Sequence, residues 1–227
     1  MKNKIIVYVD GFNLYHSLRN NYPHLKQPDV LRLVENMLGE KYDIVSVKFY
    51  TAQVTGQLAR ATQKRYLDKL NEQEKVEVHD EGRFAPTIKE GILLTGDEHY
   101  KSLLQKFPKF IREFKLLRGL KLPHTLKFRI RVEKKTDVTL ASHLVRDAFL
   151  GAFDIAAIIT NDADFTEAIR VVRSVVKNGK KLPVWLLSPT LGKNGECDPT
   201  YDLKQVVSRI IHITESDFKK AQVSRKK

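Results

Sequence analysis

Closely spaced aspartates after apolar runs are the residues of this 227-residue chain best suited to chemistry. Asp162 and Asp164 follow the run at 156–159, and Asp10 follows the run at 5–9. Carboxylates that lie close together repel one another, and hard divalent cations such as Mg²⁺ or Mn²⁺ offset that repulsion through oxygen ligands. The spacing therefore predicts a metal site, with helix N-capping by Asp162 or Asp164 as the simpler alternative.

Two unalternating β-branched runs would position these acids. Residues 5–9 and 156–159 have the pattern of strands buried on both faces, as in a parallel sheet. Such strands end at the carboxyl edge of the sheet, where open α/β folds bind ligands. Asp137 opens a predicted helix after a strand at 127–132, so it can face the same edge. We expect Asp10, Asp137, Asp162 and Asp164 to converge there.

The rest of the chain alternates between strand and helix patterns. We predict further strands at 44–50, 76–78, 182–187 and 210–213, and helices at 31–38, 58–73, 137–149 and 165–176. Asp29 is a predicted N-cap, and Asn178-Gly179 a predicted helix end. This order favours a single α/β domain over 1–227 with a mainly parallel sheet.

A basic segment interrupts this alternation. Glycines and prolines break the pattern at 80–126, which predicts an insertion with a short helix or hairpin near 100–117. Between Lys101 and Lys135 there are twelve Lys or Arg and two acids, a net charge of +10. Interleaved phenylalanines suit phosphate contact and base stacking, although core phenylalanines beside solvated lysines are the alternative. The predicted nucleic-acid contacts here are Lys106, Lys109, Arg112, Lys115 and Arg118.

Composition points to an anionic partner. The net charge of +13 and the pI of about 9.7 favour polyanions such as nucleic acid, and residues 214–227 are predicted to form a basic tail. Cys197 is the only cysteine, which excludes a disulfide within the chain and fits a reducing compartment. The apolar run before Asp10 is too short for a signal peptide, and no stretch is long enough to span a bilayer. We expect a cytoplasmic protein without a membrane partner, and a homodimer is left open.

Several other chemistries lack their motifs. The chain has neither a Walker-type lysine loop nor Gly-x-Gly-x-x-Gly, and its seven histidines do not occur at metal-binding spacing. We expect His143 to be a surface or packing residue. An aspartyl-phosphatase mechanism would require an acid two residues after Asp10, where Phe12 stands. Metal-dependent phosphodiester hydrolysis fits the acid cluster better.

Three segments together resemble the NYN domain, with the LabA-like bacterial branch the most similar. They are 8–14 (YVDGFNL), 135–138 (KTDV) and 160–165 (TNDADF). That family is similar to PIN and flap nucleases. The resemblance spans about residues 4–187 and implies a three-layer α/β/α, Rossmann-like (PIN-like) fold. It also implies metal-dependent ribonuclease activity, while the long basic insertion departs from the minimal pattern.

The resemblance also implies roles for individual residues. Asp10, Asp137, Asp162 and Asp164 would hold Mg²⁺ or Mn²⁺, and Asn13 would position Asp10 or the substrate. Lys134 or Lys135 would contact phosphate, with solvated lysines as the alternative. Thr160 would help to orient the turn and, with Asn161, lie at the nucleic-acid site. The predicted function is a metal-dependent ribonuclease, and the alternative is a weakly active or non-catalytic RNA-binding module on the same fold.

Overall fold

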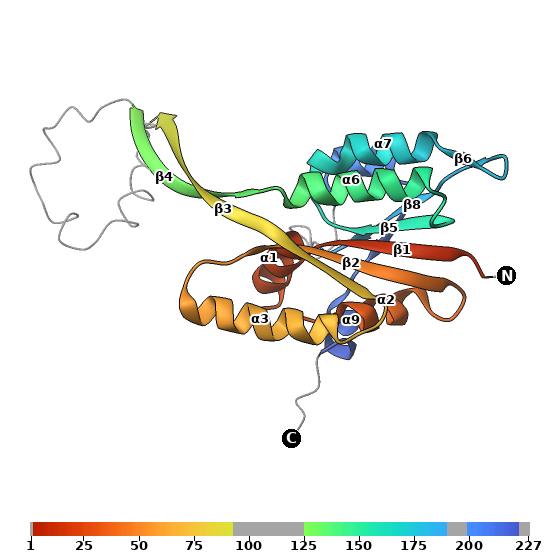
Figure 1. Ribbon diagram of the computed structural model, residues 1–227, viewed down its shortest axis with the longest axis horizontal. Coiled ribbons are helices and arrows are strands. Elements are labelled where there is room, and N and C mark those ends of the chain that lie inside the picture. The colour runs from red at the N-terminus through yellow and green to blue at the C-terminus, as the bar shows by residue number, and fades with distance from the viewer. Residues whose placement is uncertain (1, 93–124, 190–198, 223–227) are drawn as a thin grey trace, which may run out of the picture. The chain divides into compact units, whose positions relative to one another are not determined.

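The computed structural model describes residues 2–92, 125–189 and 199–222 (Figure 1). They belong to two compact units, 1–84 with 133–227 and 85–132. The larger unit contains all four predicted acids.

A mainly parallel sheet organises the chain, as predicted. Its strands are β1 (Lys4–Asp10), β2 (Asp43–Gln53), β3 (Val76–Ile92), β4 (Thr125–Lys134), β5 (Ile155–Ile159), β8 (Val184–Ser188) and β9 (Arg209–His212). They lie in the order β4-β3-β2-β1-β5-β8-β9, and every pairing from β3 to β9 is parallel. Asp10 pairs with Tyr50, and Val9 with Ile159, so β1, β2 and β5 reach the carboxyl edge together.

Helices cover both faces of the sheet (Figure 1). The helices α6 (Thr136–Phe149), α7 (Thr166–Ser174) and α8 (Tyr201–Val206) share one core with the sheet, and α1 (Gly11–Asn21), α2 (Val30–Leu38), α3 (Gln57–Asn71) and α9 (Glu215–Lys220) share the other. The strand β1 supplies Val7 to one core and Ile6 to the other, as its unalternating pattern requires. This arrangement confirms the predicted three-layer α/β/α fold. Among the described residues, no helix has the length and apolar character to cross a membrane.

The strand β3 is longer than the predicted 76–78 and continues to Ile92. Gly82 explains how it passes beside β2, because a Cβ there would lie 2.8 Å from the backbone oxygen of Thr51. The β2–β3 register also shifts between Tyr50 and Ala52. We predicted that an insertion begins at residue 80, but the chain continues there as the bulged strand β3. The predicted helix or hairpin near 100–117 lies outside the described residues.

The helix α7 ends earlier than predicted. It stops at Ser174, and Val176, the last residue of the predicted helix, is 62% exposed. The short strands β6 (Val176–Lys177) and β7 (Lys180–Lys181) form a hairpin instead. Its turn residues Asn178 and Gly179 have φ of 52° and 74°, the conformation for which a two-residue hairpin selects Asn-Gly.

Part of the predicted basic tail is a packed helix. Thr214 and Asp217 form a capping box that starts α9, and Phe218 and Ala221 are completely buried in the core with α2. The amide of Asp29 donates to the carbonyl of Ala221 at 2.8 Å. The tail interpretation is therefore wrong for residues 214–222, because Phe218 supplies apolar area that a core can bury.

Candidate active site

Asp10 is buried at the end of β1, and both of its carboxylate oxygens accept hydrogen bonds. Its Oδ1 accepts from the amide of Asn13 at 2.9 Å, which makes it the N-cap of α1. Its Oδ2 accepts from the hydroxyl of Thr160 at 3.0 Å. Asp10 is only 5% exposed. It therefore anchors the turn between β1 and α1 and links it to the end of β5.

Gly11 allows this turn to lie directly against β2. A Cβ at Gly11 would stand 2.5 Å from Cζ of Phe49 and 2.7 Å from the carbonyl oxygen of Tyr50. Real Cβ atoms do not approach a backbone oxygen so closely. The glycine after Asp10 is thus required by close backbone packing.

The turn after β5 is held by a chain of side-chain hydrogen bonds. The amide of Asn161 donates to Oδ1 of Asn13 at 3.1 Å, and the amide of Asp162 donates to Oγ1 of Thr160 at 3.1 Å. The Oδ1 of Asn161 accepts from the amide of Thr200 at 3.0 Å, just before α8. Asn13 of α1 and Thr200, just before α8, therefore hold the turn that carries Asn161 from two sides.

Thr160 orients the turn, but it does not form part of a nucleic-acid surface. It is completely buried, so the predicted contact with nucleic acid is wrong for this residue. The oxygen of its side chain both donates to Asp10 and accepts from Asp162. Asn161 is only partly buried, and its amide oxygen is engaged by Thr200, which gives this residue a bracing role.

Asp137, Asp162 and Asp164 interact electrostatically. Partial burial raises the pKa of the Asp137 carboxyl, and the charges of Asp162 and Asp164 raise it further. Asp137 lies in the first turn of α6, and this helix packs against the short 3₁₀ turn Ala163–Phe165. The structure thus places three of the predicted acids within range of mutual repulsion.

Asp162 is also a cap, but of the 3₁₀ turn that precedes α7, whereas the simpler alternative predicted a cap of the helix itself, which has no side-chain cap. Its Oδ1 accepts from the amide of Asp164 at 2.9 Å and starts the 3₁₀ turn. Capping and metal binding are compatible, since one carboxylate has two oxygens and about four acceptor sites. The cap therefore fixes the orientation of Asp162 relative to Asp164.

The fit of these acids to a metal ion is partial. Their carboxylate oxygens are the donors that Mg²⁺ and Mn²⁺ prefer, and a cation would relieve the repulsion at Asp137. In the arrangement described for residues 2–92, 125–189 and 199–222, however, no three or more Asp, Glu, His or Cys side chains are placed to hold an ion. Asp137 and Asp164 are exposed, so their side chains have room to rotate toward Asp162.

Lys135 adopts an uncommon backbone conformation immediately before α6. Its φ is 84°, in a region that costs a residue with a side chain of order 1–3 kcal/mol. The neighbouring Thr136 is buried, and its hydroxyl has no partner among the described atoms. Lys134 and Lys135 are both exposed, as a phosphate contact requires. The strained residue and Asp137 are therefore two positions apart at the start of one helix.

The other predicted cationic contacts fall outside the described residues. These are Lys106, Lys109, Arg112, Lys115 and Arg118, and Cys197 also lies outside the described ranges. Their contribution to nucleic-acid binding stays a prediction.

An aromatic cluster beside Asp10 was missed from the sequence. The rings of Phe12 and His16 lie 4.3 Å apart, and those of Phe12 and Phe84 lie 5.7 Å apart. Tyr15 adds an edge contact to His16 at 5.4 Å. The spacing of Phe12, Tyr15 and His16 on one helix was the available signal, since residues three and four apart are neighbours on a helix surface.

A buried polar network under α6 was also missed. Lys48 and Tyr8 each approach Oδ2 of Asp147 to 2.8 Å, and all three residues are buried. Burial alone would raise the pKa of Asp147, but hydrogen bonds from Lys48, Tyr8 and Arg146 outweigh it and lower that pKa. Asp147 lies ten residues after Asp137, about 15 Å along the helix. The network therefore fastens α6 to the sheet rather than forming part of the acid site.

His143 is a packing residue, as its position in the helix predicted. Its Nδ1 lies 2.9 Å from the hydroxyl of Tyr50, and its ring packs edge-on against His79 with centroids 4.9 Å apart. His79 in turn stacks on Tyr50. The pKa values of His79 and His143 are both lowered, primarily by burial.

Comparisons with known proteins support the fold. No family model matches the chain. The crystal structure of a protein of unknown function from Vibrio parahaemolyticus aligns over 96% of each chain with a TM-score of 0.54 and 15% identity, so the two share a fold. The chain is also 26% identical over 209 residues to 6-hydroxy-3-succinoylpyridine 3-monooxygenase of Pseudomonas putida. That similarity covers 83% of this chain and 60% of the relative's length.

Proposed function

We propose that this protein is a metal-dependent ribonuclease that hydrolyses phosphodiester bonds of RNA at the carboxyl edge of its sheet. The observation that carries the proposal is the electrostatic coupling of Asp137 with Asp162 and Asp164 at the edge where β1 ends in Asp10. Like charges in such a cluster are costly without a counter-ion. A chain with a net charge of +13 suits an anionic substrate. We place this activity in the cytosol, in keeping with the single cysteine.

The residues of the site have distinct tasks in this proposal. Asp137, Asp162 and Asp164 would hold Mg²⁺ or Mn²⁺, which supplies an activated water and charge stabilisation at the phosphate. Asp10 positions this group through its hydrogen bond with Thr160, whose hydroxyl oxygen also fixes the amide of Asp162. Lys134 and Lys135 contact backbone phosphates on the flank of the site.

A cleavage assay tests the proposal. Labelled RNAs, single-stranded, hairpin and duplex, are incubated with wild type in Mg²⁺, in Mn²⁺ and in EDTA. We expect cleavage that requires the metal and that Asp164→Asn abolishes. Asp43→Asn is the matched control, since Asp43 is exposed at the opposite, amino end of β2. Equal cleavage with and without EDTA would refute the metal, and cleavage unaffected by Asp164→Asn would refute the site.

An RNA-binding module without catalysis is a second candidate. It is favoured by the arrangement of the acids, since no group of three or more among the described residues is placed to hold an ion. The presence of four acids at one edge argues against a pure binder, because negative charge at the binding surface weakens RNA binding. Binding of the same RNAs without cleavage in either metal would establish this candidate.

The Pseudomonas putida relative supports a third candidate, oxygenation of a heteroaromatic ring. The observation that favours it is 26% identity across 83% of this chain. A monooxygenase transfers one atom of O₂ to its substrate and reduces the other to water with two electrons from a reductant. Uptake of O₂ that requires both a hydroxypyridine and NADH or NADPH would establish this oxygenase activity. Absence of uptake would exclude an oxygenase that uses these two reductants.

A further inference from the structure

Aromatic side chains form an exposed cluster at the start of α1. It consists of Phe12, Tyr15 and His16 of α1 with Phe84 of β3. Phe12 lies at the centre, in ring contact with both His16 and Phe84. Phe12 and Tyr15 are 36% and 37% exposed, so the cluster keeps apolar ring surface in contact with water. We call these four residues the aromatic platform.

The platform adjoins the acid edge through the backbone. Phe12 is two residues after Asp10, whose carboxylate caps the same helix. Gly11, between them, is locked against β2 by the approach of Phe49 and Tyr50. The position of Phe12 relative to Asp10 is therefore fixed by the packing of the turn. Its neighbour Asn13 accepts a hydrogen bond from the amide of Asn161, which joins this turn to the one that carries Asp162.

We propose that the aromatic platform is the stacking site for one unpaired nucleobase of the RNA strand whose phosphate lies at the acid edge. This inference rests on the proposed function and specifies its substrate. Exposed aromatic rings next to a phosphate site can stack on a nucleobase, since every base has a flat aromatic face. The net charge of +13 makes a polyanion the complementary occupant, in preference to an apolar peptide.

Stacking on the platform would favour RNA substrates that are unpaired at the stacked nucleotide. A base within a duplex is stacked on its neighbours and is not available to an external ring, whereas loops and single strands can turn a base outward. The enzyme would therefore prefer RNA in which the nucleotide next to the scissile phosphate is unpaired. It would tolerate any of the four bases, since stacking does not depend on hydrogen-bonding edges.

An abasic scan tests this proposal. Single-stranded RNA of one sequence is prepared as a series in which one nucleotide after another lacks its base, and binding is measured in EDTA by fluorescence anisotropy. For wild type, loss of the base at one position should weaken binding roughly 5- to 150-fold. Phe12→Ala should weaken binding of the intact RNA by a similar factor and abolish the dependence on that position. Phe12→Tyr should retain the dependence on that position, since the aromatic ring is kept.

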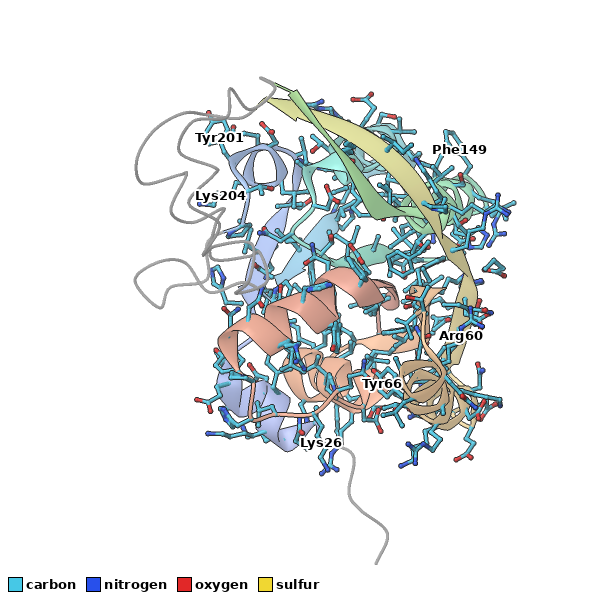
Figure 2. All side chains as sticks on the ribbon, turned by 90° about the vertical axis from the view of Figure 1, so that its left-hand side faces the viewer. Lys26, Arg60, Tyr66, Phe149, Tyr201 and Lys204 are labelled. Atoms are coloured by element: carbon cyan, nitrogen blue, oxygen red, sulfur yellow. The ribbon has the colours of Figure 1, made fainter. Side chains whose placement is uncertain are left out.

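Phe149→Ala is the matched control for this scan. Phe149 is 68% exposed, in α6 twelve residues beyond Asp137 and about 18 Å along the helix, and Figure 2 shows it on the side opposite Tyr201 of α8. We expect this variant to bind every RNA in the series as wild type does. A melting temperature close to that of wild type shows that Phe12→Ala is folded.

The possible failures are distinguishable. Metal-dependent cleavage with no position-dependent loss in the scan would overturn the platform and leave the nuclease standing. A clear position-dependent loss without cleavage would support the platform on an RNA-binding module. No binding to any RNA would overturn both proposals. RNA binding unaffected by Phe12→Ala, together with a change in sedimentation, would assign the platform to contact with a second copy of the chain.

Discussion

The hydroxyl of Thr160 donates a 3.0 Å hydrogen bond to Oδ2 of Asp10, across 150 positions of sequence. The same oxygen accepts from the amide of Asp162 at 3.1 Å. Because β1 and β5 are adjacent and parallel, one buried hydroxyl fixes the separation of two strand ends. The relative placement of Asp10 and Asp162 therefore depends on a residue that is itself inaccessible to substrate.

Replacing Thr160 by Val removes this oxygen at nearly constant volume. We expect a loss of about 1–3 kcal/mol in the free energy of unfolding, since the hydrogen bonds of the Thr160 oxygen with Asp10 and with the amide of Asp162 are both lost. Cleavage of RNA should fall with it, because the turn carrying Asp162 is no longer fixed to Asp10. Urea denaturation and single-turnover cleavage measure the two effects. Thr160→Ser should recover both, and a fully active Val variant would contradict the argument.

Asp162→Asn separates capping from metal binding. Asn caps nearly as well as Asp, so the metal-free variant should melt at or above the temperature of wild type, since one repelling charge has gone. A bound ion stabilises wild type by mass action, by about 2.7 kcal/mol at 100 times its Kd. The variant should gain less from Mg²⁺ and lose most activity. A full Mg²⁺-dependent shift in melting temperature with unchanged activity would show that Asp162 is only a cap.

Gly11→Ala should be destabilising although the backbone conformation tolerates alanine. The added Cβ meets the carbonyl oxygen of Tyr50, which belongs to β2 and cannot rotate away. Overpacking of this kind costs about 1–3 kcal/mol. Thermal melts compare it with Asn20→Ala, an exposed change in the same helix that should alter stability by less than about 0.5 kcal/mol. Equal melting temperatures of the two variants would show that the turn between β1 and α1 can shift to accommodate the added Cβ.

Partly buried histidines should make the protein sensitive to mild acid. Burial lowers the pKa of His79 and His143 below the ordinary 6.5, so the unfolded chain binds protons first as the pH falls. Stability is therefore fully present above about pH 6.5 and declines below it. Urea denaturation between pH 7.5 and pH 5 measures the decline. His143→Phe should make it shallower, whereas an unchanged slope would assign the protons to other groups.

Lys48→Met should reveal the cost of an unbalanced buried charge. Removing one partner of a buried ion pair costs about 3–5 kcal/mol. We expect a loss of stability at the lower end of this range, because Tyr8 and Arg146 still donate to Asp147. The double variant Lys48→Met with Asp147→Leu should recover part of the loss. Denaturation of the three proteins measures this, and additive losses would contradict a coupled pair.

The sequence predicted those features that depend on burial patterns and chain order. The unalternating runs around Val7 and Ile158 specify strands covered on both faces, and their acidic ends place Asp10 and Asp162 at one edge. The prediction failed where one residue pattern is compatible with two different structures. Asn178-Gly179 suits both a helix end and a hairpin, and only packing of the preceding Val176 decides between them.

The missed parts of the site depend on contacts between distant segments. The aromatic platform requires Phe84 to reach Phe12, and the periodicity around Gly82 hid the strand that carries it. Thr160 was predicted to orient the turn and also to lie at the nucleic-acid site, but its burial against Asp10 depends on the β1–β5 pairing. Local patterns contain no information on such pairings until the sheet order is known.

The docking of α9 on α2 has a consequence for synthesis on the ribosome. Glu215 and Gln222 hydrogen-bond to His24 and to the backbone of Lys26, across 191 and 196 positions. At about 5–20 residues per second, roughly 10–40 seconds separate the emergence of these partners. Until then the apolar face of α2 that receives Phe218 stays uncovered. The nascent chain would therefore leave this apolar face in contact with water during that interval.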